Sequence, residues 1–505
     1  MSRNTESRFA INPTNIDISR SRFKRDSSLK TTFNVGDLIP FFCDEVLPGD
    51  TFDIETAKVV RMQTLVAPIM DNIYLDTYFF FVPNRLVWSH WRELMGENTA
   101  SAWIPQAQYS VPQLTSPAST GWTKGTIADY FGIPTGVTGL SVNAMPFRAY
   151  ALICNEWFRD ENLTDPLYIP VNDATVAGVN TGNYRSDVAK GGLPFKAAKY
   201  HDYFTSCLPA PQKGPDVKVP LGDNAPVYAG GSLHTKTQAA MQWKQQTGTA
   251  FSQTYTNWPL GLHTGAQTDY ARIQADETAK TSGQGHTWFD VVPANLYADL
   301  SLATGQTINA LRLAFQIQKL FEKDAIGGTR YIEILKAHFG VTSPDSRLQR
   351  PEYLGGNRIP INIHQVLSTA ETNNAELGAT GAYSLTVDSH SDFVHSFTEH
   401  GFVIGVMVAR YDHSYQNGLE RMWTRQDRFD YYWPVLANIG NTGVRNDQIY
   451  AQGTSTDSEI FGYQEAWAEY RYKPSYVTGE MRSNVQTSLD AWHLADVYSQ
   501  LPTLD

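Results

Sequence analysis

A short aromatic run near the start of the chain constrains the fold more than any other feature. Residues 71–91 read DNIYLDTYFFFVPNRLVWSHW, and the run from Tyr78 to Val82 is apolar without interruption. The run is too short for a helix and rich in residues that favour strands, so it predicts a strand buried on both faces and ended by Pro83. Apolar residues at helical spacing follow and predict a short helix. They are Leu86, Val87, Trp88 and Trp91.

Strand-like segments spread over most of the chain predict a mainly β fold. Residues 51–55 alternate between apolar and polar side chains, as a half-buried strand does, and residues 402–410 are rich in apolar β-branched side chains. Because such segments do not alternate regularly with helices, they favour antiparallel sheets over a βαβ series. An antiparallel jelly roll of two sheets, with long loop insertions and several helices, fits this pattern, and other β-sandwiches fit it as well.

Three segments carry helical periodicity. Residues 146–162 predict an amphipathic helix that packs on a core, residues 307–323 predict the clearest helix, and residues 331–339 predict one that ends at Gly340 in a left-handed cap. The stripe on the first segment is Tyr150, Ile153, Cys154, Trp157 and Phe158. The apolar face of the second is Ile308, Leu311, Ala314, Phe315, Ile317 and Phe321.

The chain has a basic beginning and an acidic remainder. Its net charge is −11, but residues 1–30 hold seven basic and three acidic side chains, which gives +4 for this arm and −15 for the rest. The chain as a whole is therefore no polycation that coats nucleic acid. In residues 19–25, SRSRFKR, basic residues alternate with serine and Phe23, which suits phosphate contacts and one stacked base, although an ordinary solvated terminus explains the pattern equally well. The candidate DNA-binding residues are Arg20, Arg22, Lys24, Arg25 and Lys30.

The composition changes between residues 216 and 290. Large aliphatic residues become rare there, while threonine, glutamine, alanine and glycine become frequent. The stretch is too long for an ordinary connection, so it predicts a surface insertion, and its aromatic residues favour a small packed unit over disorder. The expected organisation is a basic N-terminal arm, a first part of the β domain, the insertion, and helices with the second part of the β domain. These cover residues 1–35, 36–215, 216–290 and 291–505.

No motif of a known catalytic or metal site is present. The sequence lacks H-E-x-x-H, a phosphate loop, a G-x-S-x-G elbow and an EF-hand loop. His390, His395 and His400 are spaced by five, which does not bring them together on a strand or a helix. Glu465 and Glu469 have no second acidic pair to support glycosidase chemistry. We therefore expect no catalytic residues, no metal and no cofactor.

The cysteine pattern and the hydropathy suggest a compartment. Cys43, Cys154 and Cys207 lie far apart without a C-x-x-C pair, which favours a reducing environment over a disulfide framework. The first residues lack the apolar region of a signal peptide, and no apolar run is long enough to span a membrane. We expect assembly in the cytoplasm where the chain is made, with no membrane partner.

Several long segments resemble the major capsid proteins of the Microviridae, small phages with single-stranded DNA, and of their gokushovirus branch in particular. The similar segments follow one another in the family's order, and each is long and unusual in composition. They are residues 21–52, 71–91, 147–163, 199–215, 339–356 and 462–483. The resemblance does not cover residues 216–290 or 371–384, where such capsid proteins differ from one another.

The resemblance implies a viral jelly roll of which sixty copies close into a T=1 icosahedral shell around circular single-stranded DNA. It places the protein in the virion, assembled in the cytoplasm of a bacterial host. The implied partners are other copies of the chain, the DNA genome, a small basic packaging protein, a pilot or minor capsid protein, a scaffolding protein and a host receptor. It also implies that residues 216–290 form a protrusion at the three-fold axes. Trp243, Tyr255 and Trp258 are then candidates for three-fold contact or receptor binding, although simple packing explains them too.

A function from another class also fits part of the composition. Aromatic residues make up 12% of the chain and acidic residues outnumber basic ones, as in some carbohydrate-binding β-sandwich proteins or glycan hydrolases. The two hypotheses predict different masses in solution, because a capsid protein forms very large particles and a glycan-binding protein is expected as a monomer.

Overall fold

The computed structural model divides the chain into two compact units. One comprises Met1–Pro211 and Ile326–Asp505, and the other comprises Gln212–Ala325. The structure describes residues 19–63, 65–98, 108–217, 308–369 and 377–504, together with the backbone of strands between residues 227 and 298. The described fold is mainly β, and its strands pair antiparallel except for β4 with β6. The expected mainly β, antiparallel fold class is thus confirmed at this level.

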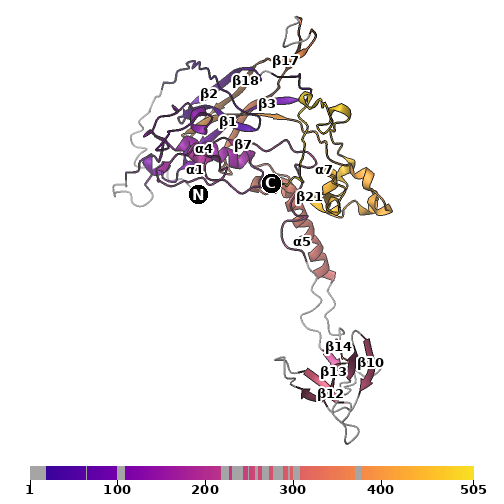
Figure 1. Cartoon of the computed structure of the whole chain (residues 1–505). Helices are drawn as coiled ribbons and strands as arrows, with labels where there is room; N and C mark the ends of the chain where they lie inside the picture. Colours follow the sequence, from indigo (N-terminus) through magenta and orange to yellow (C-terminus); the bar gives the residue numbers. More distant parts are fainter. Residues whose placement is uncertain are drawn as a thin grey trace. The chain divides into compact units, whose positions relative to one another are not determined.

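The first unit contains a five-stranded antiparallel sheet with the strand order β15-β3-β19-β1-β7. Figure 1 labels its strands β1, β3 and β7. The two strands expected from their apolar sequences, at residues 78–82 and 402–410, are confirmed and are neighbours in this sheet. They pair over their full length, from Ile73 opposite Tyr411 to Pro83 opposite Gly401. The strands are β1 (Asp37–Val46), β3 (Ile73–Pro83), β7 (Phe195–Lys196), β15 (Glu352–Pro360) and β19 (Gly401–Tyr411).

Strand β3 is buried on both faces, as its sequence predicts. On one face, Phe79 and Phe81 pack against Phe393 and Phe397, with ring centroids 5.4 Å and 4.7 Å apart. Phe393 lies in β18 (Thr386–Ser396) and Phe397 directly follows it; this strand pairs antiparallel with β2 (Thr51–Val60) in a second layer. Strand β2 alternates between exposed and half-buried residues along its whole length, which confirms the predicted half-buried strand.

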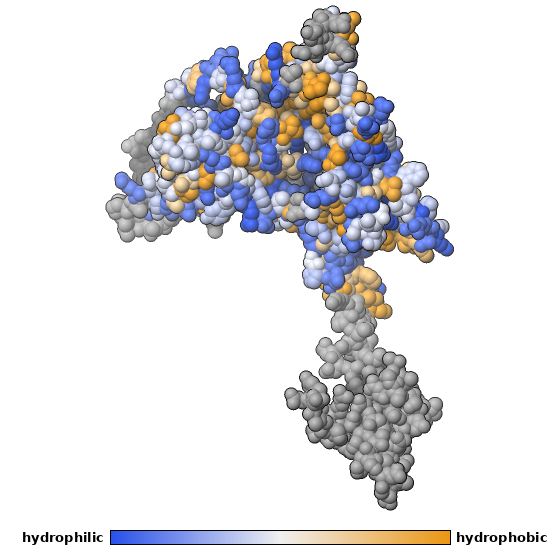
Figure 2. All heavy atoms as spheres, in the orientation of Figure 1, coloured by the Kyte–Doolittle hydropathy of each residue, from blue (hydrophilic) through white to orange (hydrophobic). Residues whose placement is uncertain are grey.

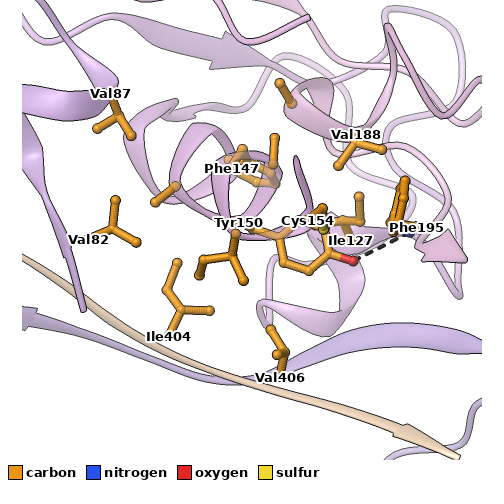
Figure 3. Packing of buried hydrophobic residues seen from close by; sticks show 14 of the residues in the cluster. Val82, Val87, Ile127, Phe147, Tyr150, Cys154, Val188, Phe195, Ile404 and Val406 are labelled. Carbon is orange, nitrogen blue, oxygen red and sulfur yellow. Dashed lines mark hydrogen bonds between the residues drawn. The ribbon is translucent and has the colours of Figure 1, made fainter. Parts of the chain in front are cut away.

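On the other face of β3, Phe80 and Val82 enter a large apolar cluster that includes helix α4 (Met145–Ile153). Figure 3 shows Val82, Ile404 and Val406 from the sheet beneath the side chains of this helix. The Tyr150 hydroxyl donates a hydrogen bond to the Leu38 carbonyl and accepts one from the Phe195 backbone N–H at 3.4 Å. The helix is therefore fixed to β1 and β7 by a polar contact inside an apolar core.

The predicted helices exist, with changes at their ends. Helix α4 continues into a π-helical turn at Cys154–Phe158 and stops there, four residues before the expected end. Helix α6 (Tyr331–Phe339) ends as predicted at Gly340, which has a φ of 68°. The single helix expected after Pro83 is instead two short ones, α1 (Asn84–Val87) and α2 (Trp91–Leu94), because the chain is extended at Trp88.

Short elements complete the first unit. After Tyr411 the described chain has two short strands, one short helix and several 3-10 turns. An apolar cluster that includes Phe204, Tyr415 and Ile449 fixes this C-terminal part. The remaining elements of the unit are β4 (Gln113–Thr115), α3 (Ile127–Tyr130), β5 (Ser141–Asn143), β6 (Val176–Ala177), β16 (Ile363–Leu367), β17 (Thr380–Ser384), β20 (Asn441–Arg445), α7 (Asn446–Ile449) and β21 (Ile460–Glu465).

The second unit contains its own antiparallel sheet, with the strand order β10-β9-β13-β12-β11, and a separate pair formed by β8 and β14. Because β8 pairs with β14, the paired strands continue beyond residue 290, where the sequence placed the end of the insertion. The unit ends in helix α5 (Ile308–Gly327). The strands are β8 (Val227–Ala229), β9 (Trp243–Thr247), β10 (Ala250–Tyr255), β11 (Leu260–His263), β12 (Arg272–Asp276), β13 (Trp288–Pro293) and β14 (Leu296–Ala298).

Candidate interaction surfaces

Residues 20–25 of the basic arm lie beside strands β1 and β2 of their own chain. Arg22 forms an ion pair of 2.7 Å with Asp53 of β2, and Arg25 forms one of 2.7 Å with Asp44 of β1. Arg20 donates a hydrogen bond to the backbone carbonyl of Gly49. The arm is thus held by acidic and carbonyl groups of the strands beside it.

These contacts leave the basic side chains close to solvent. The Arg22 side chain is 85% exposed, and that of Lys24, which pairs with Asp26 at 3.0 Å, is 86% exposed. Lys30 is exposed as well. Exposed ion pairs contribute little free energy, so a polyanion could replace the carboxylates at small cost. The arm can therefore contact phosphates, but part of its charge is already balanced within the chain.

Two of the three aromatic candidates in the insertion are paired across strands. The backbone of Trp243 in β9 lies directly opposite that of Tyr255 in β10. Trp258 lies outside the described residues. The pairing brings the first two residues together in one sheet, and their role as a contact or receptor site stays a prediction.

Helix α5 has an apolar face that the described residues do not cover. Ile308 is 70% exposed, Phe315 is 58% exposed and Leu320 is 50% exposed. Of the predicted apolar face, Ala314, Ile317 and Phe321 are half-buried and the other three residues are exposed. Figure 2 shows apolar side chains grouped on this helix. A helix with so wide an apolar face needs further burial, either from the rest of the chain or from another copy.

A second exposed apolar surface, which the sequence reading missed, lies in the C-terminal part of the first unit. Its side chains are between 43% and 87% exposed, and we call them the aromatic patch. The patch consists of Phe429, Tyr431, Tyr432, Trp433, Val435 and Tyr470. The signal in the sequence was the closely spaced RFDYYWPV at residues 428–435, which has neither helical nor strand periodicity.

Two arginines hold the patch in shape. The Arg428 guanidinium lies 5.4 Å from the ring centroid of Phe429 and 5.3 Å from that of Trp433, whose indole N–H donates to the Arg428 carbonyl at 2.8 Å. The buried Arg425 guanidinium lies 4.2 Å from the Tyr470 ring centroid and 5.5 Å from that of Tyr431. Four of the rings of the patch are therefore in contact with an arginine of the same chain.

A buried carboxylate links three strands of the main sheet. Asp76 of β3 accepts a hydrogen bond from Arg358 of β15 at 2.7 Å, from Arg410 of β19 at 2.5 Å and from the Tyr200 hydroxyl at 2.8 Å. Burial works to raise the pKa of Asp76, but these hydrogen bonds outweigh it and hold the pKa below its ordinary value. The carboxylate thus joins β3 to β15 and β19 and to Tyr200, so the network supports the sheet.

Most of the histidines and glutamates that the sequence analysis weighed as sites have other partners in the structure. His390 and His395 lie on β18, and the rings of His395 and His400 pack on Phe397 and Trp91 respectively. Glu465 pairs with Arg471 and Glu469 with Arg425. Within the described ranges, no three His, Cys, Asp or Glu side chains gather as metal ligands would. The same ranges hold no helix long and apolar enough to cross a membrane.

The comparisons with known proteins agree over the whole chain. The family described as Capsid protein (F protein) matches residues 12–505. Capsid protein VP1 of Bdellovibrio phage phiMH2K is 42% identical over 100% of this chain and 90% of the relative. Capsid protein VP1 of Spiroplasma virus 4 is 41% identical over 96% of this chain and 87% of the relative. Capsid protein VP1 of Chlamydia phage 1 is 40% identical over 99% of this chain and 90% of the relative.

Proposed function

Because the chain belongs to the family of phage capsid proteins named Capsid protein (F protein), we propose that sixty copies of it close into a T=1 icosahedral shell around circular single-stranded DNA. The chain is a structural, non-enzymatic capsid protein, and the expected resemblance to capsid proteins of Microviridae phages is confirmed. A capsid protein acts by assembling with copies of itself and is a component of the virion. The observation that carries the proposal is the similarity to three VP1 capsid proteins, which extends over nearly the full length of this chain and of each relative.

The state of the protein in solution tests this proposal directly. The chain should be expressed with the other proteins of its phage, and the lysate should be analysed by sedimentation and electron microscopy. We expect closed particles of T=1 size that contain DNA. A chain that stays monomeric, or that binds glycans as a monomer, would favour the carbohydrate-binding alternative and contradict the shell.

The two layers of the first unit support a jelly roll as the shell-forming domain. The five-stranded sheet and the β2–β18 pair face each other across a cluster of phenylalanines, as the sheets of a sandwich do. In the main sheet β1 lies between β19 and β7, so strands distant in sequence are neighbours, which is common in Greek-key folds. A measured structure of the particle would test whether the strands follow the jelly-roll order.

We expect the basic arm to contact the genome from the inner surface of the shell. Replacing Arg20, Arg22, Lys24 and Arg25 together with glutamine should lower the DNA content or the stability of particles at moderate salt, because up to four cations near the phosphates are lost. The effect should be partial, since two of these arginines already pair with aspartates and a small basic packaging protein is expected to share the neutralisation. DNA content per particle and the salt dependence of particle melting measure it.

A control that removes the acidic partners of the arm separates DNA contact from folding. Replacing Asp44 and Asp53 with asparagine breaks the same ion pairs but frees Arg22 and Arg25 for phosphates. If the arm binds DNA, this variant should keep its DNA content while the arginine variant loses it. Equal losses in both variants, or arginines found on the outer surface, would mean that the pairs serve only the fold.

We also propose that the insertion forms an outward protrusion at the three-fold axes and contacts the host. The backbones of Val227 and Ala298 are paired, and antiparallel pairing places such Cα atoms about 4.5–5.5 Å apart. Replacing residues 228–297 by a short Gly/Ser linker should therefore leave the ends in place. We expect such shells to assemble but to lose attachment to host cells, which an adsorption assay measures against the wild-type phage.

The other results of this deletion are equally informative. Normal adsorption would refute the receptor role of the insertion. Failure to assemble would show that the insertion clamps neighbouring copies together instead. Substituting Trp243 and Tyr255 separately with alanine then distinguishes a binding pocket, in which only attachment falls, from packing, in which particle stability falls.

The remaining partners follow from the family alone. A pilot or minor capsid protein, a scaffolding protein and a bacterial receptor are proposed as partners of the shell. Analysis of purified particles and of assembly intermediates by mass spectrometry would identify those that accompany the chain.

A further inference from the structure

We infer that the aromatic patch is a contact surface between two copies of this chain. The inference rests on the proposed self-assembly and names a surface that carries it. Five aromatic residues and Val435 form the patch, and all are substantially exposed in the single chain. Tyrosine and tryptophan, together with arginine, are the residues that contribute most to protein interfaces, and monomeric proteins rarely leave a group of them in solvent.

The size of the patch fits an interface. An aromatic side chain offers about 150–250 Å² of surface, so five of them at roughly half exposure present on the order of 500 Å². A stable interface buries about 800 Å² on each partner. The patch therefore supplies more than half of one partner's share, and its polar surroundings can supply the rest.

The charge of the segment decides between a protein and a nucleic acid as the partner. Residues 419–439 contain three arginines and three acidic residues, so their net charge is zero. Arg421 pairs with Asp430 at 3.6 Å and Arg425 with Glu469 at 3.2 Å. DNA binding relies on cations that are free to neutralise phosphates, and two of the three arginines here, Arg421 and Arg425, are engaged with carboxylates. If bases stacked on the rings, few free cations would be present to neutralise their phosphates.

The same neutrality favours another copy of the chain. The chain carries a net charge of −11, so most surfaces of two copies repel each other as they approach. A neutral, apolar patch is a place where two copies can meet without that repulsion. A capsid protein must bury such surfaces against its neighbours. Contacts with Arg425 and Arg428 already orient rings of the patch in the single chain, which lowers the entropy lost on association.

Assembly of surface variants tests the inference. Phe429 is 69% exposed, and among the described residues its ring lies against the Arg428 guanidinium. Val435 is 87% exposed. The double variant Phe429→Ser, Val435→Ser should fold with an unchanged melting temperature as an unassembled chain. Losing two apolar contacts should raise the chain concentration needed for assembly roughly tenfold or more. Assembly at the wild-type concentration would overturn the inference.

A matched control checks that the effect belongs to the patch. Tyr168 is 63% exposed and lies in a loop of the same unit that is far from the patch in the sequence. The variant Tyr168→Ser removes a similar exposed aromatic side chain and should leave the assembly concentration unchanged. An equal defect in this control would show that the loss is not specific to the patch and would contradict the inference.

Photo-crosslinking identifies the partner even if a variant fails to fold. A benzoyl-phenylalanine at position 429 keeps the aromatic ring, and illumination of purified particles should yield a product with the mass of two capsid chains. A nuclease-sensitive DNA adduct, an adduct with another virion protein, or no adduct would each overturn the inference. If the wild-type chain forms no particles, the proposed shell fails instead, and the two failures are thereby distinguished.

Discussion

Replacing Asp76 with asparagine is expected to lower the free energy of unfolding by about 3 kcal/mol, because it leaves Arg410 beside a neutral group in a buried site. Asp76 is 1% exposed, and its carboxylate accepts hydrogen bonds from two arginines and one tyrosine. Removing one member of a buried ion pair lowers the free energy of unfolding by more than the intact pair contributes, because the remaining charge stays buried without a partner. Arg358 is half exposed and regains water, which limits the loss.

Chemical denaturation of the unassembled chain, followed by tryptophan fluorescence, measures this loss. The exposed pair of Arg22 with Asp53 provides a matched control, since Asp53→Asn removes the same carboxylate from a surface site. We expect that control to change stability by less than about 1 kcal/mol. Similar losses in both variants would show that the buried network has no special weight.

The same network predicts how stability depends on pH. The pKa of Asp76 is lowered in the folded chain, so the folded state favours the charged carboxylate. Its contribution is complete above the unfolded pKa, near 3.9, and is lost as the pH falls through the lower folded value. The wild-type chain should therefore lose stability below about pH 4, and Asp76→Asn should lack this part of the loss. Denaturation midpoints between neutral and acidic pH measure the difference.

Replacing Phe80 with alanine is expected to lower the free energy of unfolding by about 3–5 kcal/mol. Its ring is buried, and its centroid lies 5.3 Å from that of Trp157 and 5.6 Å from that of Tyr353. The substitution removes these contacts and leaves a cavity that close-packed neighbours cannot fill. We expect few or no particles from this variant, since its folded fraction falls.

Two further variants serve as comparisons, one with a smaller change at the same site and one at an exposed site. Phe80→Leu keeps much of the volume and should lose less than half as much stability. Val59→Ala removes an exposed side chain of β2 and should change the denaturation midpoint very little. A Phe80→Ala chain as stable as wild type would mean that the helix layer does not depend on β3 for its packing.

The sequence alone determined the elements whose signal is local. The run from Tyr78 to Val82 and the segment at residues 402–410 predicted buried strands, and both are central strands of the main sheet. Gly340 ends α6 because only a residue without a side chain adopts its left-handed conformation freely. The family itself was also readable, since long segments resemble capsid proteins and the matched relatives confirm it.

Only the tertiary structure decided which residues act together. In the sequence, Asp76 is a single acidic residue before an apolar run. Its partners Arg358 and Arg410 are 282 and 334 residues away. No local pattern encodes a contact that arises when three strands align. The pairing of Arg22 with Asp53 and of Arg25 with Asp44, which balances part of the arm's charge, likewise required the strands beside the arm.

Whether an apolar residue is exposed was also decided by the tertiary structure. Periodicity identified the apolar face of α5, but a pattern of apolar residues does not say whether the chain itself supplies their cover. The aromatic patch has no periodicity, so nothing in its sequence separates it from a core segment. Burial depends on what packs against a residue from distant parts of the chain, and that information exists only in the folded protein.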